Sequence, residues 1–355
     1  DDTLYFLADD SLRVRWEIEM QRPPSSRLIR DRELIKLAIM ALDGADFVDK
    51  RIPASSSLLG DPARIPGVMQ YVPPTAAALS SKARGYSAVT RTRDILWCFH
   101  NLAENPPWTA DPDHGMHPGT PVYNTIRFAG WSSLKPMWKQ VEEIGMDVLS
   151  IGVAFPEGIN LIGYSQGGLL ARAILQRFPV HNVRNFISLS SPQAGQYGTR
   201  FLRLIFPDLA CETAYELFYS RLGQYTSVGN YWNDPHHQEF YYKYSKFLPY
   251  VNNEINGFNN SDYKIGLTKL KRMILIGGPN DGVITPWESS HFGYYDNNNT
   301  VIDMRDRDIY KFDRIGLKTL DKQGKLKTIT VPGISHTEWH TNISIVDQFL
   351  LPYLD

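Results

Sequence analysis

A serine at position 165 stands between glycines in the stretch INLIGYSQGGLLARAI, residues 159–174. A short apolar run precedes the serine and an amphipathic run follows it, which predicts a strand, a sharp turn and a helix. A serine raised on such a bend needs neighbours without a Cβ, because the helix packs closely against the strand. The pattern Gly-x-Ser-x-Gly alone is a weak signal. Its surroundings make Ser165 a candidate nucleophile rather than an incidental residue of a glycine-rich turn.

A serine hydroxyl attacks well only when a base takes its proton, and an acid must orient that base. In hydrolases with such a turn the three residues follow in the order serine, acid, histidine. Asp281 follows the apolar run 272–276 in the turn GGPNDG. Catalytic groups gather beyond the carboxyl ends of parallel strands. A plain turn uses the same residue types, but the upstream serine favours Asp281. Other aspartates lack such a strand before them: Asp234, Asp262, Asp296 and Asp303.

His336 is the expected base, because it follows the predicted strand 327–331 through the loop PGIS. His340 is its near rival, four residues later. A helix that starts near Thr337 would make His340 a packing or surface residue. His291 follows Asp281 too closely to serve.

The adjacent pair His236 and His237 raises the possibility of a metal site. Neighbouring residues on an extended chain point to opposite faces, and no further cluster of ligands accompanies the pair. We therefore expect neither a metal nor a cofactor.

A negatively charged tetrahedral intermediate needs hydrogen-bond donors. The backbone N–H of Gln166, the residue after the serine, is one expected donor. A second donor usually comes from a loop after an early strand, often with the sequence His-Gly. His114 and Gly115 have that sequence, but PWTADPD before them is no buried strand. The second donor stays unassigned.

Hydrophobic periodicity organises the chain from about residue 116. Strands are expected at 121–128, 159–164, 183–189, 271–277 and 327–331, and helices at 133–149, 166–175 and 338–354. Such alternation indicates a mostly parallel α/β sheet. Residues 1–115 form an unassigned, irregular or aberrant N-terminal extension in this interpretation, although residues 95–101 could be a short strand or helix.

An aromatic-rich insert interrupts the alternation between about residues 197 and 265, where Tyr, Phe and Trp exceed their 12% share of the chain. A helix is expected there at 212–222. The insert predicts a helical cap, whose aromatic side chains either form a satellite core or line a pocket for a long apolar group.

The totals exclude several classes of protein. The chain has 355 residues, 37 basic and 38 acidic, and a formal net charge of −1, which gives no support to a nucleic-acid partner. No apolar run is long enough to span a bilayer, and the first ten residues lack a signal-peptide layout. Cys98 and Cys211 are more readily explained as two buried thiols than as a disulfide. Asn259, Asn298 and Asn342 begin Asn-x-Ser/Thr sequons and are candidate glycosylation sites.

From about residue 117 the chain resembles the palmitoyl-protein thioesterases, most closely their second, lysosomal type. The matching stretches are HPGTPV (117–122), SLKPMWKQV (133–141), IGYSQGG (162–168), NFISLSSPQAGQYG (185–198), GNYWNDPHH (229–237), LIGGPNDGVITPW (275–287) and PGISHTEWH (332–340). The resemblance implies an α/β-hydrolase fold with a helical cap that binds the acyl chain. It also implies a triad of Ser165, Asp281 and His336, with Gln166 as oxyanion donor.

The implied function is a lysosomal glycoprotein that hydrolyses long-chain fatty acyl thioesters, either acyl-CoA-like or S-acylated substrates. The sequence departs from the family in its first 115 residues and in its small number of cysteines. Two alternatives remain. One is a carboxylesterase or lipase that uses the same triad on oxygen esters. The other is a catalytically impaired acyl-binding homologue. Acyl-chain length, leaving group and oligomeric state stay open.

Overall fold

The computed structural model describes residues 94–98, 122–125, 127–128, 130–198, 211–255, 257–258 and 260–354. For residues 94–98, 130–131 and 211–213 it describes the backbone alone. Asn259, His114, Gly115 and the side chains of Cys98 and Cys211 therefore lie outside the described part of the chain, together with the expectations that concern them.

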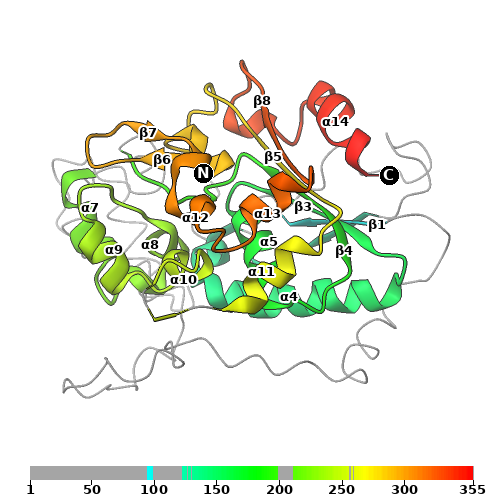
Figure 1. The fold of residues 1–355 in the computed structure, drawn as a ribbon, viewed down its shortest axis with the longest axis horizontal. Helices are drawn as coiled ribbons and strands as arrows, with labels where there is room; N and C mark the ends of the chain where they lie inside the picture. Colours follow the sequence, from blue (N-terminus) through cyan, green and yellow to red (C-terminus); the bar gives the residue numbers. More distant parts are fainter. Residues whose placement is uncertain are drawn as a thin grey trace, which may run out of the picture.

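Six parallel strands form the central sheet, in the order β2-β1-β3-β4-β5-β8 (Figure 1). The strands are β1 (Asp94–Cys98), β2 (Val122–Thr125), β3 (Ile159–Tyr164), β4 (Val183–Leu189), β5 (Arg272–Gly277) and β8 (Leu326–Thr330). The sharp turn of Ser165 joins β3 to the helix α5 (Gln166–Arg177). The expected α/β-hydrolase fold is confirmed.

The expected boundary at residue 116 is wrong, because the sheet contains an earlier strand. β1 lies between β2 and β3, with Cys98 in register with Gly163 of β3. A strand with neighbours on both edges reads as a short apolar run without alternation, which periodicity alone does not distinguish from a helix. The run ILWCF at 95–99 is such a case.

Alternate residues of the central strands serve two hydrophobic cores. Leu161, Phe186 and Leu275 face the larger core, which includes α4 (Met137–Ala154), α5, α11 (Ser261–Thr268) and α13 (Leu317–Lys322). Ile162, Ile187 and Ile276 face the smaller core with Trp339 and α14 (Ile343–Phe349). Figure 1 shows α4 and α14 on opposite sides of the sheet. Burial on both faces explains why the strands read as continuous apolar runs.

Two expected helices have different bounds in the structure. The helix expected at 133–149 begins only after Pro136, as α4, and is preceded by the 3-10 helix η4 (Gly130–Leu134). The single helix expected at 338–354 is wrong. It is divided into η8 (His336–Glu338), α14 and η9 (Leu351–Tyr353). Asn342 starts α14 by accepting a hydrogen bond from the backbone N–H of Ser344, and Pro352 belongs to η9.

The segment between β4 and β5 contains the expected helical cap. Its helices are α7 (Cys211–Phe218), η5 (Gly223–Tyr225), α8 (Ser227–Tyr231), α9 (Gln238–Tyr244) and α10 (Leu248–Val251), and they lie at one end of the sheet in Figure 1. Many cap aromatics are buried in the larger core, including Phe218, Trp232 and Phe247. The satellite-core interpretation therefore accounts for much of the aromatic enrichment.

The chain after β5 adds small elements before β8. They are η6 (Trp287–His291), the antiparallel pair β6 (Tyr294–Tyr295) and β7 (Val301–Ile302), η7 (Met304–Asp306) and α12 (Asp308–Lys311).

Candidate active site

Ser165 lies on a strained turn between β3 and α5. Its φ of 55° is in the left-handed region, which is costly for a residue with a side chain. The backbone N–H of Ser165 donates to the carbonyl oxygen of Leu189 at 2.9 Å, which fixes the turn to the end of β4. A Cβ on Gly163 would lie 2.5 Å from the Cα of Gly168. This close approach is the physical reason for the glycines around the serine.

His336 approaches the serine from the loop after β8. The Nε2 atom of His336 lies 2.9 Å from the Oγ atom of Ser165, and its Nδ1 atom lies 2.8 Å from Oδ2 of Asp281. The loop is anchored at two points. The Tyr164 hydroxyl donates to the His336 carbonyl oxygen at 2.6 Å, and the His336 N–H donates to the Asp281 carbonyl oxygen at 2.9 Å. The structure thus brings the three expected residues together, although 171 residues separate the serine from the histidine.

The carboxylate of Asp281 is buried and surrounded by donors. Its Oδ1 atom accepts hydrogen bonds from the backbone N–H groups of Val283 and Ile284 at 3.0 and 2.7 Å. Its Oδ2 atom accepts bonds from the Ser190 hydroxyl at 2.5 Å and from the Trp339 indole at 2.7 Å, besides His336. Burial favours the neutral acid, but the hydrogen bonds and charge of His336, with Ser190 and the backbone, outweigh it and hold the pKa of Asp281 below its usual value.

This ionised carboxylate determines the proton on the histidine. A carboxylate has no hydrogen to donate, so the Nδ1 atom of His336 must carry a proton toward Asp281. Its Nε2 atom then presents a lone pair to the Ser165 hydroxyl. The arrangement is able to take a proton from the serine and to stabilise the resulting imidazolium.

Gln166 is the first residue of α5, so its backbone N–H has no acceptor within the helix. Its side-chain amide donates to the carbonyl oxygen of Ser133 at 2.9 Å, which links the turn to η4. On the other side of the turn, β1 ends at Cys98, in register with Gly163. The chain that follows it, residues 99–121, lies outside the described residues, and the second oxyanion donor remains unassigned.

The rival acids have local structural roles. Asp296 accepts bonds from the backbone of a turn, Asp303 caps η7, and Asp262 lies in the first turn of α11. Asp234 is paired with His237 in the cap, with 3.0 Å between Oδ2 and Nδ1.

The rival histidines are both withdrawn from solvent and lie apart from Ser165 in the hydrogen-bond network. His291 lies 3.2 Å through Nε2 from the Ile329 carbonyl oxygen, and burial lowers its pKa to about 4. The ring of His340 packs against that of Tyr164, with centroids 4.7 Å apart. Burial, with a smaller effect of His336, lowers the pKa of His340 to about 4. His340 is thus a packing residue, although it lies in a turn rather than on the expected helix.

Among the described residues, no group of three or more His, Cys, Asp or Glu side chains could hold a metal ion. The structure contains no helix, within the same residues, that is long and apolar enough to cross a membrane.

Two of the three candidate glycosylation sites are described. Asn298 is exposed in the turn between β6 and β7, and Asn342 is half-buried at the start of α14. Glycosylation of these residues stays a prediction.

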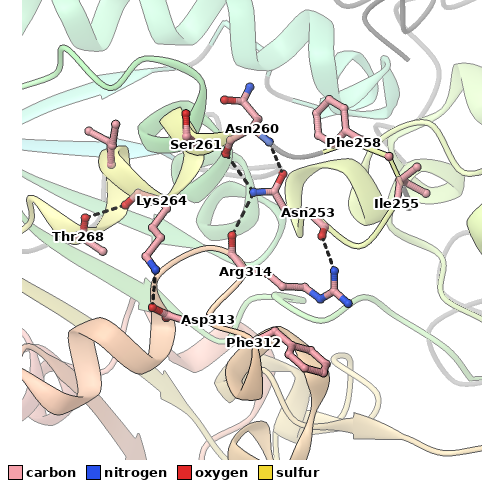
Figure 2. A pocket seen from close by; sticks show the side chains of 12 residues that line it. Asn253, Ile255, Phe258, Asn260, Ser261, Lys264, Thr268, Phe312, Asp313 and Arg314 are labelled. Carbon is pink, nitrogen blue, oxygen red and sulfur yellow. Dashed lines mark hydrogen bonds and ion pairs between the residues drawn. The ribbon is translucent and has the colours of Figure 1, made fainter. Parts of the chain in front are cut away.

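A hollow of about 650 Å³ lies away from the triad, between α11 and the segment 312–314 (Figure 2). Its polar groups bind one another. Lys264 forms an ion pair with Asp313 at 2.7 Å, and the Asn253 amide donates to the carbonyl oxygens of Asn260 and Arg314 at 3.0 and 3.1 Å. None of the three triad residues lines this hollow.

Sequence reasoning missed three residues that contact the triad. Tyr164 precedes the serine, Ser190 directly follows β4, and Trp339 follows η8. The position of Ser190 at the carboxyl end of a predicted strand was a usable signal. Trp339 gave no such signal, because a tryptophan near the C-terminus reads as an ordinary core residue.

Comparisons with known proteins place the chain in a family. A sequence model described as palmitoyl protein thioesterase matches residues 110–336. The chain belongs to this family. Its members are thioester hydrolases, and so is this protein. The chain is 56% identical over 240 residues to the lysosomal thioesterase PPT2 homolog of Drosophila melanogaster, covering 68% of this chain and 83% of that protein.

The human lysosomal thioesterase PPT2 is 45% identical over 239 residues, covering 67% of this chain and 79% of that protein. Among solved structures, a lipase-esterase related protein from Clostridium acetobutylicum aligns with a TM-score of 0.38 at 13% identity, covering 74% of this chain and 95% of that one.

Proposed function

We propose that this palmitoyl protein thioesterase family member is a serine thioesterase that hydrolyses long-chain fatty acyl thioesters, acyl-CoA-like or S-acylated. The observation that carries the proposal is the continuous hydrogen-bond chain from Ser165 through His336 to Asp281. It joins a strained serine to a histidine and a buried carboxylate in the relative order and geometry that acyl transfer requires.

The reaction proceeds through an acyl-enzyme. His336 Nε2 takes the hydroxyl proton of Ser165 as its Oγ atom attacks the thioester carbonyl carbon. The backbone N–H of Gln166 stabilises the oxyanion. The carbon–sulfur bond breaks, and His336 returns the proton to the leaving thiolate. Water, activated by the same histidine, then hydrolyses the ester and releases the fatty acid. Asp281 stabilises the imidazolium in both steps.

Replacement of the serine tests this proposal. Ser165→Ala should lower kcat for palmitoyl-CoA hydrolysis on the order of a million-fold, because the nucleophile is removed. Ser227→Ala is a matched control. Ser227 is a buried serine of the cap whose hydroxyl has no partner among the described residues, and its variant should keep wild-type activity. Retained hydrolysis by Ser165→Ala would exclude the mechanism.

The substrate class needs a separate measurement. We expect faster turnover of a palmitoyl thioester than of the matching oxygen ester, measured side by side at equal concentration. The opposite order would favour a carboxylesterase or lipase. Palmitate binding without turnover, and without labelling of Ser165 by a fluorophosphonate, would favour the impaired acyl-binding homologue.

We also infer a lysosomal location, supported by the similarity to the lysosomal thioesterases of Drosophila and human. The proposal extends to N-glycosylation at Asn259, Asn298 or Asn342. Co-localisation of the full-length protein with a lysosomal marker, and a mobility shift after removal of N-glycans, test these two points.

A further inference from the structure

Five donors converge on the carboxylate of Asp281. The two on Oδ1 are backbone N–H groups, which cannot accept a hydrogen bond. Three side chains donate to Oδ2: His336 and Trp339, which lie three residues apart at η8, and Ser190, which follows β4. A triad requires only the histidine among them. The two additional side chains therefore need an explanation.

The Trp339 indole can donate a hydrogen bond but cannot accept one. Its indole N–H has no acceptor function, and the side chain is fully buried beside Tyr164 and Ile276 in the smaller core. At 2.7 Å from Nε1 to Oδ2, it faces an oxygen that must accept. A protonated Asp281 would have to turn its O–H elsewhere, and the Oδ1 side is already occupied by two N–H donors. The indole thus disfavours the neutral acid.

Ser190 reaches the same oxygen from the end of β4. Its backbone has a φ of 40°, outside the regions that residues with side chains prefer. Its N–H donates to the Ile276 carbonyl oxygen at 2.7 Å, which fixes the strained residue between β4 and β5. Such strain persists only where the surrounding structure requires it, and it often marks functional positions.

We propose that Trp339 and Ser190 are positioning residues that hold Asp281 as an acceptor-only carboxylate and thereby fix the Nδ1–H tautomer of His336. The proposal rests on the triad roles proposed above. The tryptophan and the serine act through Asp281 and do not touch the substrate. With both donors in place, the lone pair of His336 Nε2 stays directed at Ser165.

The pH dependence of Ser165 labelling by a fluorophosphonate tests the inference in the full chain. Trp339→Phe keeps an aromatic ring but removes the donor. We expect the maximal labelling rate to fall about ten- to a hundred-fold. The acid limb of the labelling rate against pH should move up by about one pH unit, since the carboxylate of Asp281 loses one charge-stabilising hydrogen bond. Ser190→Ala, a smaller change in volume, should move the limb in the same direction.

The other titratable groups that neighbour His336 do not titrate in the pH range of this measurement. Tyr164 faces His336, and burial together with the charge of Asp281 raises its pKa further above neutrality. His340 is the other neighbour of the Tyr164 ring, and its pKa lies at about 4. Neither Tyr164 nor His340 therefore adds an acid limb to the labelling profile above about pH 5.

Trp138→Phe is the matched control. Trp138 is also buried, and its indole donates at 2.7 Å to the Lys246 carbonyl oxygen in the cap. This variant should leave the acid limb unchanged. In an Asp281→Asn background, Trp339→Phe should have almost no additional effect, because both act on one group.

Two results would overturn the inference: an unmoved acid limb in both Trp339→Phe and Ser190→Ala, or effects that multiply with that of Asp281→Asn. The downfield proton NMR signal of His336 Nδ1–H gives a readout without turnover, and Trp339→Phe should shift it. Wild-type protein that turns over oxygen esters alone would contradict the proposed substrate class and leave these readouts intact.

Discussion

The proposed triad and the cap each contain an aspartate paired with a histidine, but only the histidine of the first pair faces a serine hydroxyl. Asp281 and His336 are 2.8 Å apart, and Asp234 and His237 are 3.0 Å apart, in both cases between Oδ2 and Nδ1. Both aspartate side chains are almost fully buried. By its residue types and distance, the cap pair resembles the proposed catalytic pair.

The two pairs differ in what lies beyond the histidine. His336 faces the Ser165 hydroxyl, whereas the ring of His237 is stacked on Tyr215 with centroids 3.8 Å apart. No serine hydroxyl bonds to His237 within the described part of the chain. Asp234 instead accepts a bond from the backbone N–H of His236, so the cap pair stabilises a turn before α9. Of the two pairs, only Asp281–His336 is placed to take a proton from a serine hydroxyl.

Truncation of the two histidines should give the largest contrast. His336→Ala should lower kcat on the order of a million-fold, because the serine loses its base. His237→Ala should leave kcat within about threefold and lower the free energy of unfolding by about 1–3 kcal/mol, since the buried carboxylate of Asp234 loses a hydrogen-bond partner. Steady-state hydrolysis and chemical denaturation measure the two quantities. Comparable losses of kcat in both variants would contradict the distinction.

Replacement of each aspartate by asparagine should give a smaller difference in kcat between the two pairs than truncation of the histidines does. Asp281→Asn should reduce kcat about ten-thousand-fold, because an amide hydrogen facing Nδ1 favours the wrong tautomer of His336. The equivalent change Asp234→Asn should keep kcat within about threefold. Far-ultraviolet circular dichroism verifies that both variants are folded. Wild-type turnover by folded Asp281→Asn would remove the aspartate from the mechanism.

The sequence predicted the triad because each member lies where a strand ends. The order of serine, acid and histidine, with an apolar run before each, led to Ser165, Asp281 and His336 without tertiary information, and the structure brings these three side chains together. The sequence did not predict Trp339, whose indole reaches Asp281 only after the C-terminal segment folds back onto β3 to β5. Local periodicity contains no information on such a contact between distant segments.

Periodicity predicted some strands well but did not place β1 or the breaks in the C-terminal helix. Periodicity identified β3, β4 and β5 almost to the residue, since a helical or loop segment separates each from the next. It did not place β1, because a short run such as DILWC is compatible with a strand or a helix until its partners are known. The C-terminal helix was overestimated, because the amphipathic pattern continues across the breaks at Asn342 and Pro352.

A third histidine sharpens the comparison, because its partners are backbone groups instead of a carboxylate. His181 Nε2 lies 2.8 Å from the Gly266 carbonyl oxygen, and Nδ1 accepts from the Val183 N–H at 3.1 Å. Burial lowers the pKa of His181 from 6.5 to about 4. The unfolded chain therefore binds a proton at His181 more readily than the folded chain does. His181 thus stabilises the fold above about pH 6.5, and this contribution is lost as the pH falls toward 4.

Between pH 7 and pH 5 this loss should reach on the order of 2 kcal/mol. His181→Asn removes the titration, so its free energy of unfolding should fall less than that of the wild type over the same interval. Urea denaturation at several pH values measures both. Parallel curves for the two proteins would show that His181 does not titrate in this way.

The position of the cap in the chain allows the cap to change while the sheet is retained. The cap leaves the sheet after Leu189 and returns at Arg272, and the strands at these ends, β4 and β5, are immediate neighbours. An insertion whose ends meet on adjacent strands can lengthen, shorten or be exchanged while the strand register is retained. The cap is thus free to diversify within one lineage, while the residues at the strand ends are retained.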